Sequence, residues 1–290
     1  MKHLFDILRG MVIGLANLIP GVSGGTMMVS MGIYDTLIHC ITHLFKQFKK
    51  SVLTLLPYAV GMLAGILALA SLIHWGLENY SLPTNTLFIG LILGGLGPLL
   101  KRIDRKKLGP AAAIAFIALF ALIIWLGLQN RDSIQNAETI DMNAGQMLIM
   151  VFLGMIASGT MIIPGVSGSL VLMLLGYYKA VTGALKTVAH GLVHFDFAGL
   201  GQPMLMLLPF LLGIVLGLFG VAKLIEWLTR RYPTPTYCGV LGLVVASPIA
   251  LLIQTDFSGT TVLLAAAAVL TFIVGFLAAW RLAGSEKEQA

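Results

Sequence analysis

The chain of 290 residues is 58% hydrophobic and 10% charged, with a formal net charge of +6 and a mean hydropathy of +0.95. A soluble globular domain is closer to half apolar and a quarter charged, so this composition excludes an ordinary water-soluble fold and makes lipid the solvent for much of the surface. The positive charge does not indicate nucleic-acid binding, because the basic residues lie in short clusters between apolar runs and are not interleaved with aromatic residues.

The first predicted element is an apolar hairpin at 4–41, which Pro-Gly-Val-Ser-Gly interrupts at 20–24. A helix from Leu4 to Pro20 would extend about 25 Å at 1.5 Å per residue, which is short of a hydrocarbon core of roughly 30 Å. We therefore expect a re-entrant hairpin that turns inside the membrane. Three unbroken apolar segments of helical length follow, at 52–77, 86–100 and 109–128, and they are predicted to be transmembrane helices.

The same order of segments recurs in the second half of the chain. A broken apolar segment at 144–185 carries Pro-Gly-Val-Ser-Gly again, and unbroken segments follow at 204–228, 237–253 and 260–281. Residues 10–34 and 154–178 align without a gap, and the similarity continues through later positions such as Trp75 with Trp227 and Gly90 with Gly242. The duplication predicts two repeats, 1–128 and 144–290, joined by an external linker at 129–143 and forming one transmembrane domain.

The basic residues predict the orientation of the chain in the membrane. If each broken segment returns to the side from which it enters, most of the 18 Lys and Arg residues fall on the N-terminal side. By the positive-inside rule both termini are then cytoplasmic. Three full crossings per half is an odd number, so we predict an all-α polytopic membrane protein whose second half is inverted relative to the first, each half being a re-entrant helical hairpin plus three transmembrane helices. The tips of the two hairpins are then expected to meet.

The two Pro-Gly-Val-Ser-Gly turns form the predicted binding site. Proline stops the preceding helix, glycine permits a tight turn, and serine is a preferred N-cap for the helix that follows. The free N–H groups and positive dipole end of that helix suit an anion, a phosphate in particular. The alternative is a break that only packs the two hairpins together. The predicted site residues are Asn17, Pro20, Gly21, Val22, Ser23, Gly24, Gly25, Thr26, Pro164, Gly165, Val166, Ser167, Gly168 and Ser169.

Four ionisable residues at equivalent positions of the repeats are candidates for coupling or gating. They form the pairs Asp35 with Lys179 and His74 with Glu226. An ionisable group inside a membrane is a functional candidate by default, and ordinary interfacial charge is the alternative. A further group, His190, His194 and Asp196, has the residue types of a metal site but is a weak signal. We therefore predict neither a metal nor a cofactor.

The repeated motifs, with Gly-Met-Val-Ile-Gly-Leu-Ala-Asn-Leu-Ile-Pro before the first, resemble the bacterial polyprenyl-phosphate transporter family, formerly a membrane family of unknown function. The resemblance covers nearly the whole chain, from residue 6 to residue 282. It implies a flippase, not an enzyme, that returns undecaprenyl phosphate from the outer to the cytoplasmic leaflet of the bacterial cytoplasmic membrane for reuse in cell-envelope polymer synthesis. The family's motif positions correspond to Asn17, 20–26 and 164–169, although Ser169 and Leu170 replace the Gly-Thr of the first copy.

Two other functions remain alternatives. A small-anion secondary carrier would use the same turns to bind carboxylate or inorganic phosphate. A membrane polyprenyl-diphosphate phosphatase would need a nucleophile or base beside Arg or a metal, and the predicted core near either turn contains no Arg and no Glu–His pair. A purely structural scaffold is disfavoured by the broken helices. The expected partners are undecaprenyl phosphate and membrane lipids, without nucleic acid, and a homo-oligomer stays open.

Overall fold

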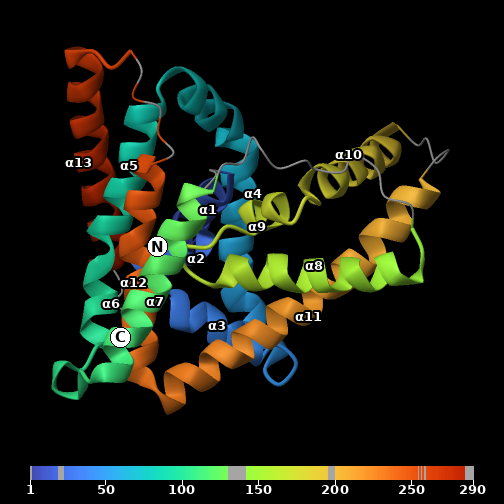
Figure 1. The fold of residues 1–290 in the computed structure, drawn as a ribbon, viewed down its shortest axis with the longest axis horizontal. Coiled ribbons are helices and arrows are strands. Elements are labelled where there is room, and N and C mark those ends of the chain that lie inside the picture. The colour runs from blue at the N-terminus through green and yellow to red at the C-terminus, as the bar shows by residue number, and fades with distance from the viewer. Residues whose placement is uncertain are drawn as a thin grey trace. The chain divides into compact units, whose positions relative to one another are not determined.

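The computed structural model describes residues 2–18, 23–129, 142–194, 200–253 and 259–284, together with 255 and 257. Every secondary-structure element in these residues is a helix (Figure 1). In chain order the helices are α1 (Lys2–Leu18), α2 (Gly24–Ser30), α3 (Tyr34–Thr42), α4 (Phe48–Asn79), α5 (Ser81–Gly94), α6 (Leu96–Arg102), the 3-10 helix η1 (Arg105–Lys107), α7 (Pro110–Leu128), α8 (Ala144–Ile162), α9 (Gly168–Leu174), α10 (Tyr178–His194), α11 (Gly201–Arg231), α12 (Pro233–Ile253) and α13 (Val262–Gly284).

Seven stretches in the described residues are long and apolar enough to cross a membrane, which confirms the predicted all-α polytopic membrane protein. Six of them coincide with the unbroken apolar segments, and the one expected at 86–100 extends over α5 and α6 from Ser81 to Arg102. The seventh is α8, the first limb of the second broken segment. Its 19 residues extend about 28 Å at 1.5 Å per residue. Length alone therefore does not separate a re-entrant limb from a crossing limb in the second half.

The chain divides into two compact units. Unit 1 comprises Met1–Leu128, Ile163–Val166 and Lys223–Ala290, and unit 2 comprises Gln129–Ile162 and Ser167–Ala222. These units differ from the sequence repeats, because the last two helices of the second repeat and its Pro164 turn belong to unit 1.

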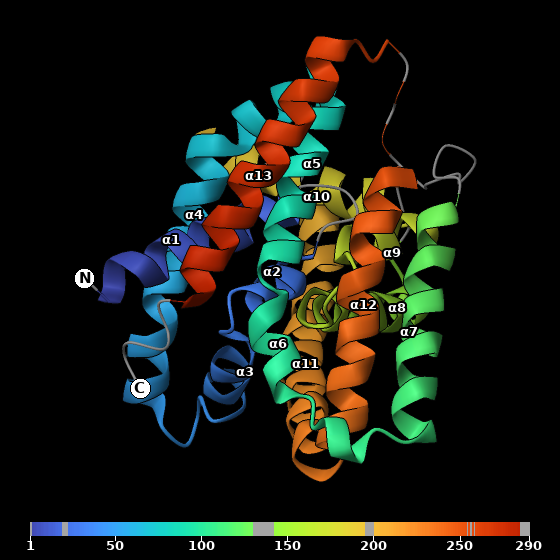
Figure 2. The ribbon, with the colours of Figure 1, turned by 90° about the vertical axis from the view of Figure 1, so that its left-hand side faces the viewer.

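Unit 1 is built on three helix pairs, α1 with α4, α5 with α13, and α7 with α12 (Figure 2). Glycines let the paired backbones approach closely: Gly90 of α5 faces the carbonyl of Phe272, and Gly242 of α12 faces the carbonyl of Phe116. A side chain at either glycine would collide with the partner backbone, and small residues are the usual means of such close packing in membranes. Gly90 and Gly242 are equivalent positions of the two repeats. The last helix of each repeat, α7 or α13, therefore packs in the same way on the second-to-last helix of the other repeat, α12 or α5.

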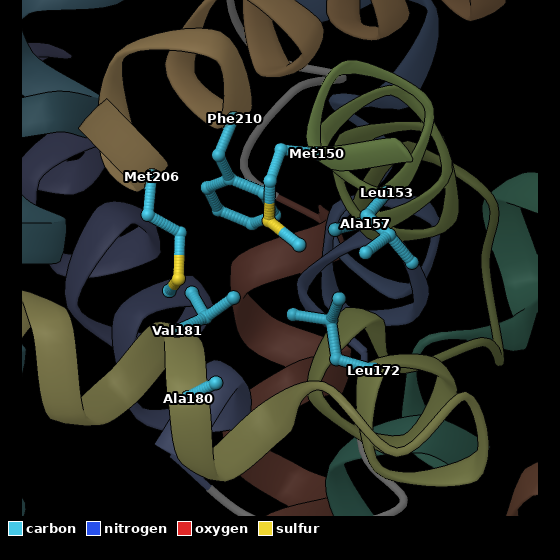
Figure 3. Close-up of a cluster of buried hydrophobic side chains, with 8 residues drawn as sticks. All are labelled: Met150, Leu153, Ala157, Leu172, Ala180, Val181, Met206 and Phe210. Carbon is cyan, nitrogen blue, oxygen red and sulfur yellow. The ribbon is translucent and has the colours of Figure 1, made fainter. Parts of the chain in front are cut away.

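Unit 2 has its own apolar core between α8, α9, α10 and the first part of α11. Eight buried side chains form it, as Figure 3 shows: Met150, Leu153, Ala157, Leu172, Ala180, Val181, Met206 and Phe210. Gly154 of α8 faces the carbonyl of Phe210 in α11, as Gly10 of α1 faces the carbonyl of Tyr58 in α4 within unit 1. Equivalent glycines thus determine the first helix pair of both repeats.

The short helices α2 and α9, which follow the two turns, end in the same way. Gly32 and Gly176 have φ values of 75° and 80°, the left-handed conformation that favours glycine after a helix. The Gly32 N–H donates to the Val29 carbonyl at 3.0 Å, and the Gly176 N–H donates to the Met173 carbonyl at 2.9 Å. Each repeat therefore has the same order of broken helix, seven-residue helix, glycine cap and longer helix.

Candidate functional site

The first turn is described from Ser23 onward, because the predicted site residues Pro20, Gly21 and Val22 lie outside the described residues. Ser23 has an extended backbone and caps α2: its Oγ accepts a hydrogen bond from the Gly25 N–H at 3.2 Å. Asn17, near the end of α1, accepts from the Gly24 N–H with Oδ1 at 3.1 Å. Two N-terminal N–H groups of α2 are thus satisfied by side chains of the protein itself. An anion at this turn must replace those side-chain acceptors.

The turn around Pro164 lies against the first turn within unit 1. The Gly165 N–H donates to Thr26 Oγ1 at 2.6 Å, and Ser23 Oγ donates to the Ile163 carbonyl at 3.3 Å. The two turns are therefore in contact, as expected of the hairpin tips. Their depth in a membrane stays a prediction.

Gly165 is required at its position by both conformation and space. Its φ is +82°, and a Cβ there would lie 2.9 Å from the Leu243 carbonyl oxygen and 3.0 Å from Ser247 Oγ. A side chain at this position is unfavourable on both grounds. The second turn is thereby fitted between the first turn and α12.

Ser23 and Thr26 are buried, with exposed fractions of 2% and 0%. A buried hydroxyl is costly unless it is hydrogen-bonded, and both hydroxyls have partners here. In this arrangement they connect the two turns to each other. Binding of a ligand between the turns would exchange these bonds for bonds to the ligand.

Ser167, Gly168 and Ser169 belong to unit 2. Ser167 precedes α9 as its N-cap residue, but its side chain makes no hydrogen bond to the helix backbone. Its Oγ instead lies 2.8 Å from Ser169 Oγ. Because Ser169 replaces the Gly25 of the first copy, the extra hydroxyl diverts the capping serine. The two turns are therefore chemically unequal.

Asp35, in the first turn of α3, connects three elements of unit 1. The Tyr237 hydroxyl of α12 donates to Asp35 Oδ2 at 3.0 Å, and Arg102 Nη2, at the end of α6, lies 3.1 Å from the same oxygen. Lys179, which occupies the equivalent position in the second repeat, is an exposed residue of α10 in unit 2. The equivalence of the two residues in sequence does not give them equivalent surroundings.

Glu226, in the C-terminal part of α11 within unit 1, accepts a hydrogen bond from Arg230 at 2.6 Å. The Nδ1 atoms of His39 and His43, on and just after α3, lie 3.5 Å and 3.8 Å from the same Oε1. The equivalent His74 lies in α4, and its side chain is outside the described residues.

The sequence did not predict the partners of the Asp35 and Glu226 carboxylates. Arg102 and Arg230 lie in the basic clusters, which we used only to predict orientation, and His39 was not considered. The i, i+4 spacing of His39 and His43 was a signal that could have drawn attention to that face of α3.

The donor set of His39, His43 and Glu226 has the atoms of a metal site, since one ligand atom from each lies within 4.8 Å of the others. The Arg230 guanidinium, however, already contacts the carboxylate oxygen that a cation would need. The other candidate metal group cannot be placed, because Asp196 and the side chains of His190 and His194 lie outside the described residues.

A buried ion pair near the N-terminus was also missed. Asp6 and Arg9 are 6% and 4% exposed. Asp6 accepts from the Tyr58 hydroxyl at 2.7 Å, and Arg9 donates to the Leu282 carbonyl at 2.8 Å. The pair thus joins α1 to α4 and α13, so Arg9 is a buried charge that connects helices of unit 1.

Known proteins identify the family and confirm the predicted resemblance. Residues 13–263 match a family model described as undecaprenyl phosphate translocase-like. A polyprenyl-phosphate transporter of Vibrio cholerae serotype O1 is 32% identical over 261 residues, which cover 85% of this chain and 77% of the relative. A polyprenyl-phosphate transporter of Staphylococcus aureus is 32% identical over 277 residues, which cover 94% and 93%. No solved structure matches the chain. The chain therefore belongs to the undecaprenyl phosphate translocase-like family.

Proposed function

We propose that this protein is a flippase for undecaprenyl phosphate that returns the lipid from the outer to the cytoplasmic leaflet of the bacterial cytoplasmic membrane. One observation carries the proposal: two copies of one Pro-Gly-Val-Ser-Gly turn, 144 residues apart in sequence, contact each other through Thr26 and Gly165. The relatives are named as polyprenyl-phosphate transporters. Those names describe transport and not catalysis, which agrees with the expectation that the protein is not an enzyme.

The hydrogen bonds of the turns suggest how a phosphate would be held. The N–H groups of Gly24, Gly25 and Gly165 each donate to a side-chain oxygen, that of Asn17, Ser23 or Thr26 respectively. Phosphate oxygens are stronger acceptors than amide or hydroxyl oxygens, because a hydrogen bond to an ionised acceptor is charge-assisted. A headgroup between the turns would therefore replace these acceptors and would also accept from the freed hydroxyls.

Transport then follows from opening and closing of the contact between the turns. The headgroup is held between them while the prenyl tail stays in lipid, and relative movement of the repeats exposes the headgroup to the other leaflet. The sequence contains no nucleotide-binding Gly-x4-Gly-Lys-[Ser/Thr] motif. The driving force on the anionic headgroup is therefore the membrane potential, an ion gradient or the lipid gradient.

The test is translocation of labelled undecaprenyl phosphate by the purified full-length protein in sealed liposomes. We expect protein-dependent transfer that is at least tenfold slower in the double variant Ser23→Ala/Ser167→Ala. The control is Ser158→Ala, which removes a buried serine whose Oγ donates to the Met155 carbonyl of its own helix. Absence of transfer by the wild type under every pH and ion gradient would refute the lipid substrate and favour the small-anion carrier. Transfer that is equally fast in the double variant would refute the site.

A further inference from the structure

A polar cavity lies in unit 1 between α3, α6, α11 and α12. Its volume is about 250 Å³, and its polar lining comes mainly from Asp35, His39, Arg102, Glu226, Arg230 and Tyr237. The end of α6 and the junction of α11 with α12 lie together at the lower end of both ribbon views (Figures 1 and 2). This is the end that carries the basic clusters at 101–107 and 230–231.

Each of the two arginines at the cavity is held by one carboxylate. Arg102 contacts Asp35 at 3.1 Å, and Arg230 contacts Glu226 at 2.6 Å. The arginine side chains are 58% and 68% exposed, whereas those of Asp35 and Glu226 are 34% and 16% exposed. Ion pairs exposed to this extent contribute little to stability. An incoming anion could therefore replace the carboxylates as partner of both guanidinium groups.

We propose that this cavity binds a phosphate monoester dianion, with Arg102 and Arg230 as its principal partners. The guanidinium group is planar and carries paired donors that match phosphate oxygens, which a lysine does not provide. The Tyr237 hydroxyl and the His39 imidazole supply further donors at the same cavity. Two arginines from separate elements, the ends of α6 and α11, can approach one anion from two directions.

The size of the cavity limits the ligand to a headgroup or a small anion. Pockets for drug-sized ligands have volumes of about 300–1,000 Å³, so 250 Å³ does not accommodate a polyprenyl tail as well. Two sources share the phosphate chemistry: the headgroup of the transported lipid and free phosphate. The first source rests on the proposed function, and the second does not.

The position of Asp35 connects the cavity to the first turn. Asp35 is the second residue of α3 and lies only three residues after Gly32, the glycine that ends α2. Phosphate binding to Arg102 would release Asp35 from its ion pair and loosen the attachment of α3 to α6. Anion binding in the cavity is thus linked, through Asp35 and α3, to movement of the first turn.

A metal ion at His39, His43 and Glu226 is the competing use of the same region. Loss of the carboxylates should affect phosphate binding and metal binding in opposite ways. Neutralising Asp35 and Glu226 frees both arginines and strengthens phosphate binding, but it removes a ligand from a metal site.

The experiment is calorimetric titration of the full-length protein in detergent with inorganic phosphate and with farnesyl phosphate, a short polyprenyl phosphate. We expect Arg102→Gln/Arg230→Gln to weaken phosphate binding at least tenfold. The matched control Arg105→Gln/Arg231→Gln removes the same charge from neighbouring arginines that do not line the cavity, and we expect less than a threefold change. Asp35→Asn/Glu226→Gln should tighten phosphate binding about tenfold. Equal weakening of phosphate binding in both arginine variants would overturn the proposal. So would weaker phosphate binding together with loss of zinc binding in Asp35→Asn/Glu226→Gln, once size-exclusion chromatography shows that this variant is folded.

Competition between the two ligands identifies the source of the phosphate. Displacement of inorganic phosphate by farnesyl phosphate indicates the lipid headgroup, and binding of inorganic phosphate alone indicates free phosphate. The liposome assay separates this proposal from the proposed function. A wild type that binds phosphate through Arg102 and Arg230 but moves no lipid upholds the cavity and refutes the flippase. A wild type that moves lipid while Arg102→Gln/Arg230→Gln binds phosphate as well as the control refutes the cavity alone.

Discussion

Replacement of Thr26 by valine tests the contact between the two turns most directly. Thr26 is fully buried, and its Oγ1 is the acceptor for the Gly165 N–H at 2.6 Å. Valine has nearly the same shape, so the change removes the hydroxyl with little effect on packing. The Gly165 N–H is then left buried without that acceptor, which costs about 1–3 kcal/mol.

That free energy corresponds to roughly a 5- to 150-fold change in the equilibrium between joined and separated turns, at 1.4 kcal/mol per tenfold. We expect Thr26→Val to lower the thermal unfolding midpoint in detergent and to slow lipid translocation at least tenfold, because the same hydroxyl is proposed to contact the headgroup. Thr26→Ser retains the hydroxyl and should recover most of both properties.

The control for this substitution is Thr187→Val. Thr187 is exposed on α10, and its hydroxyl donates to the Gly183 carbonyl one turn earlier. A surface change of this kind should alter stability by no more than about 0.5 kcal/mol. If Thr26→Val resembled Thr187→Val in both unfolding midpoint and translocation, the contact between the turns would have no energetic importance and the mechanism built on it would be wrong.

Three further predictions concern the turn, the buried ion pair and the topology. Gly165→Ala should destabilise the protein by about 1–2 kcal/mol because of its positive φ, whereas Gly183→Ala, in an open helical position, should be neutral or stabilising; equal unfolding midpoints for the two variants would contradict the strain argument. Asp6→Ala removes a buried carboxylate that contacts the buried Arg9 and should cost about 3–5 kcal/mol, while Asp104→Ala breaks an exposed pair and should cost less than about 1 kcal/mol, measured by chemical denaturation. A single cysteine at Asn143, in an otherwise cysteine-free chain, should react with an impermeant thiol reagent in intact cells, and reaction only after lysis would refute the external linker.

The sequence by itself determined the features that depend on local composition. Apolar runs of helical length specify membrane helices because an isolated backbone in lipid must satisfy its own hydrogen bonds. Glycine and proline at 20–25 and 164–168 specify where those helices break, since their effect on the backbone needs no distant partner. The glycine caps at Gly32 and Gly176 are of the same kind. The duplication also predicted that the two turns would come together.

Only the tertiary structure decided which distant residues became partners. Sequence equivalence paired Asp35 with Lys179, but the fold brings Arg102 of α6 and Tyr237 of α12, which lie 67 and 202 residues away, into contact with Asp35. The tertiary structure likewise shows that the N–H groups of Gly24 and Gly25, at the start of α2, are already hydrogen-bonded to Asn17 and Ser23. Such contacts depend on how closely helices approach. That distance depends on glycines far apart in the chain, where any side chain would collide with the partner backbone, so no local sequence pattern predicts the contacts.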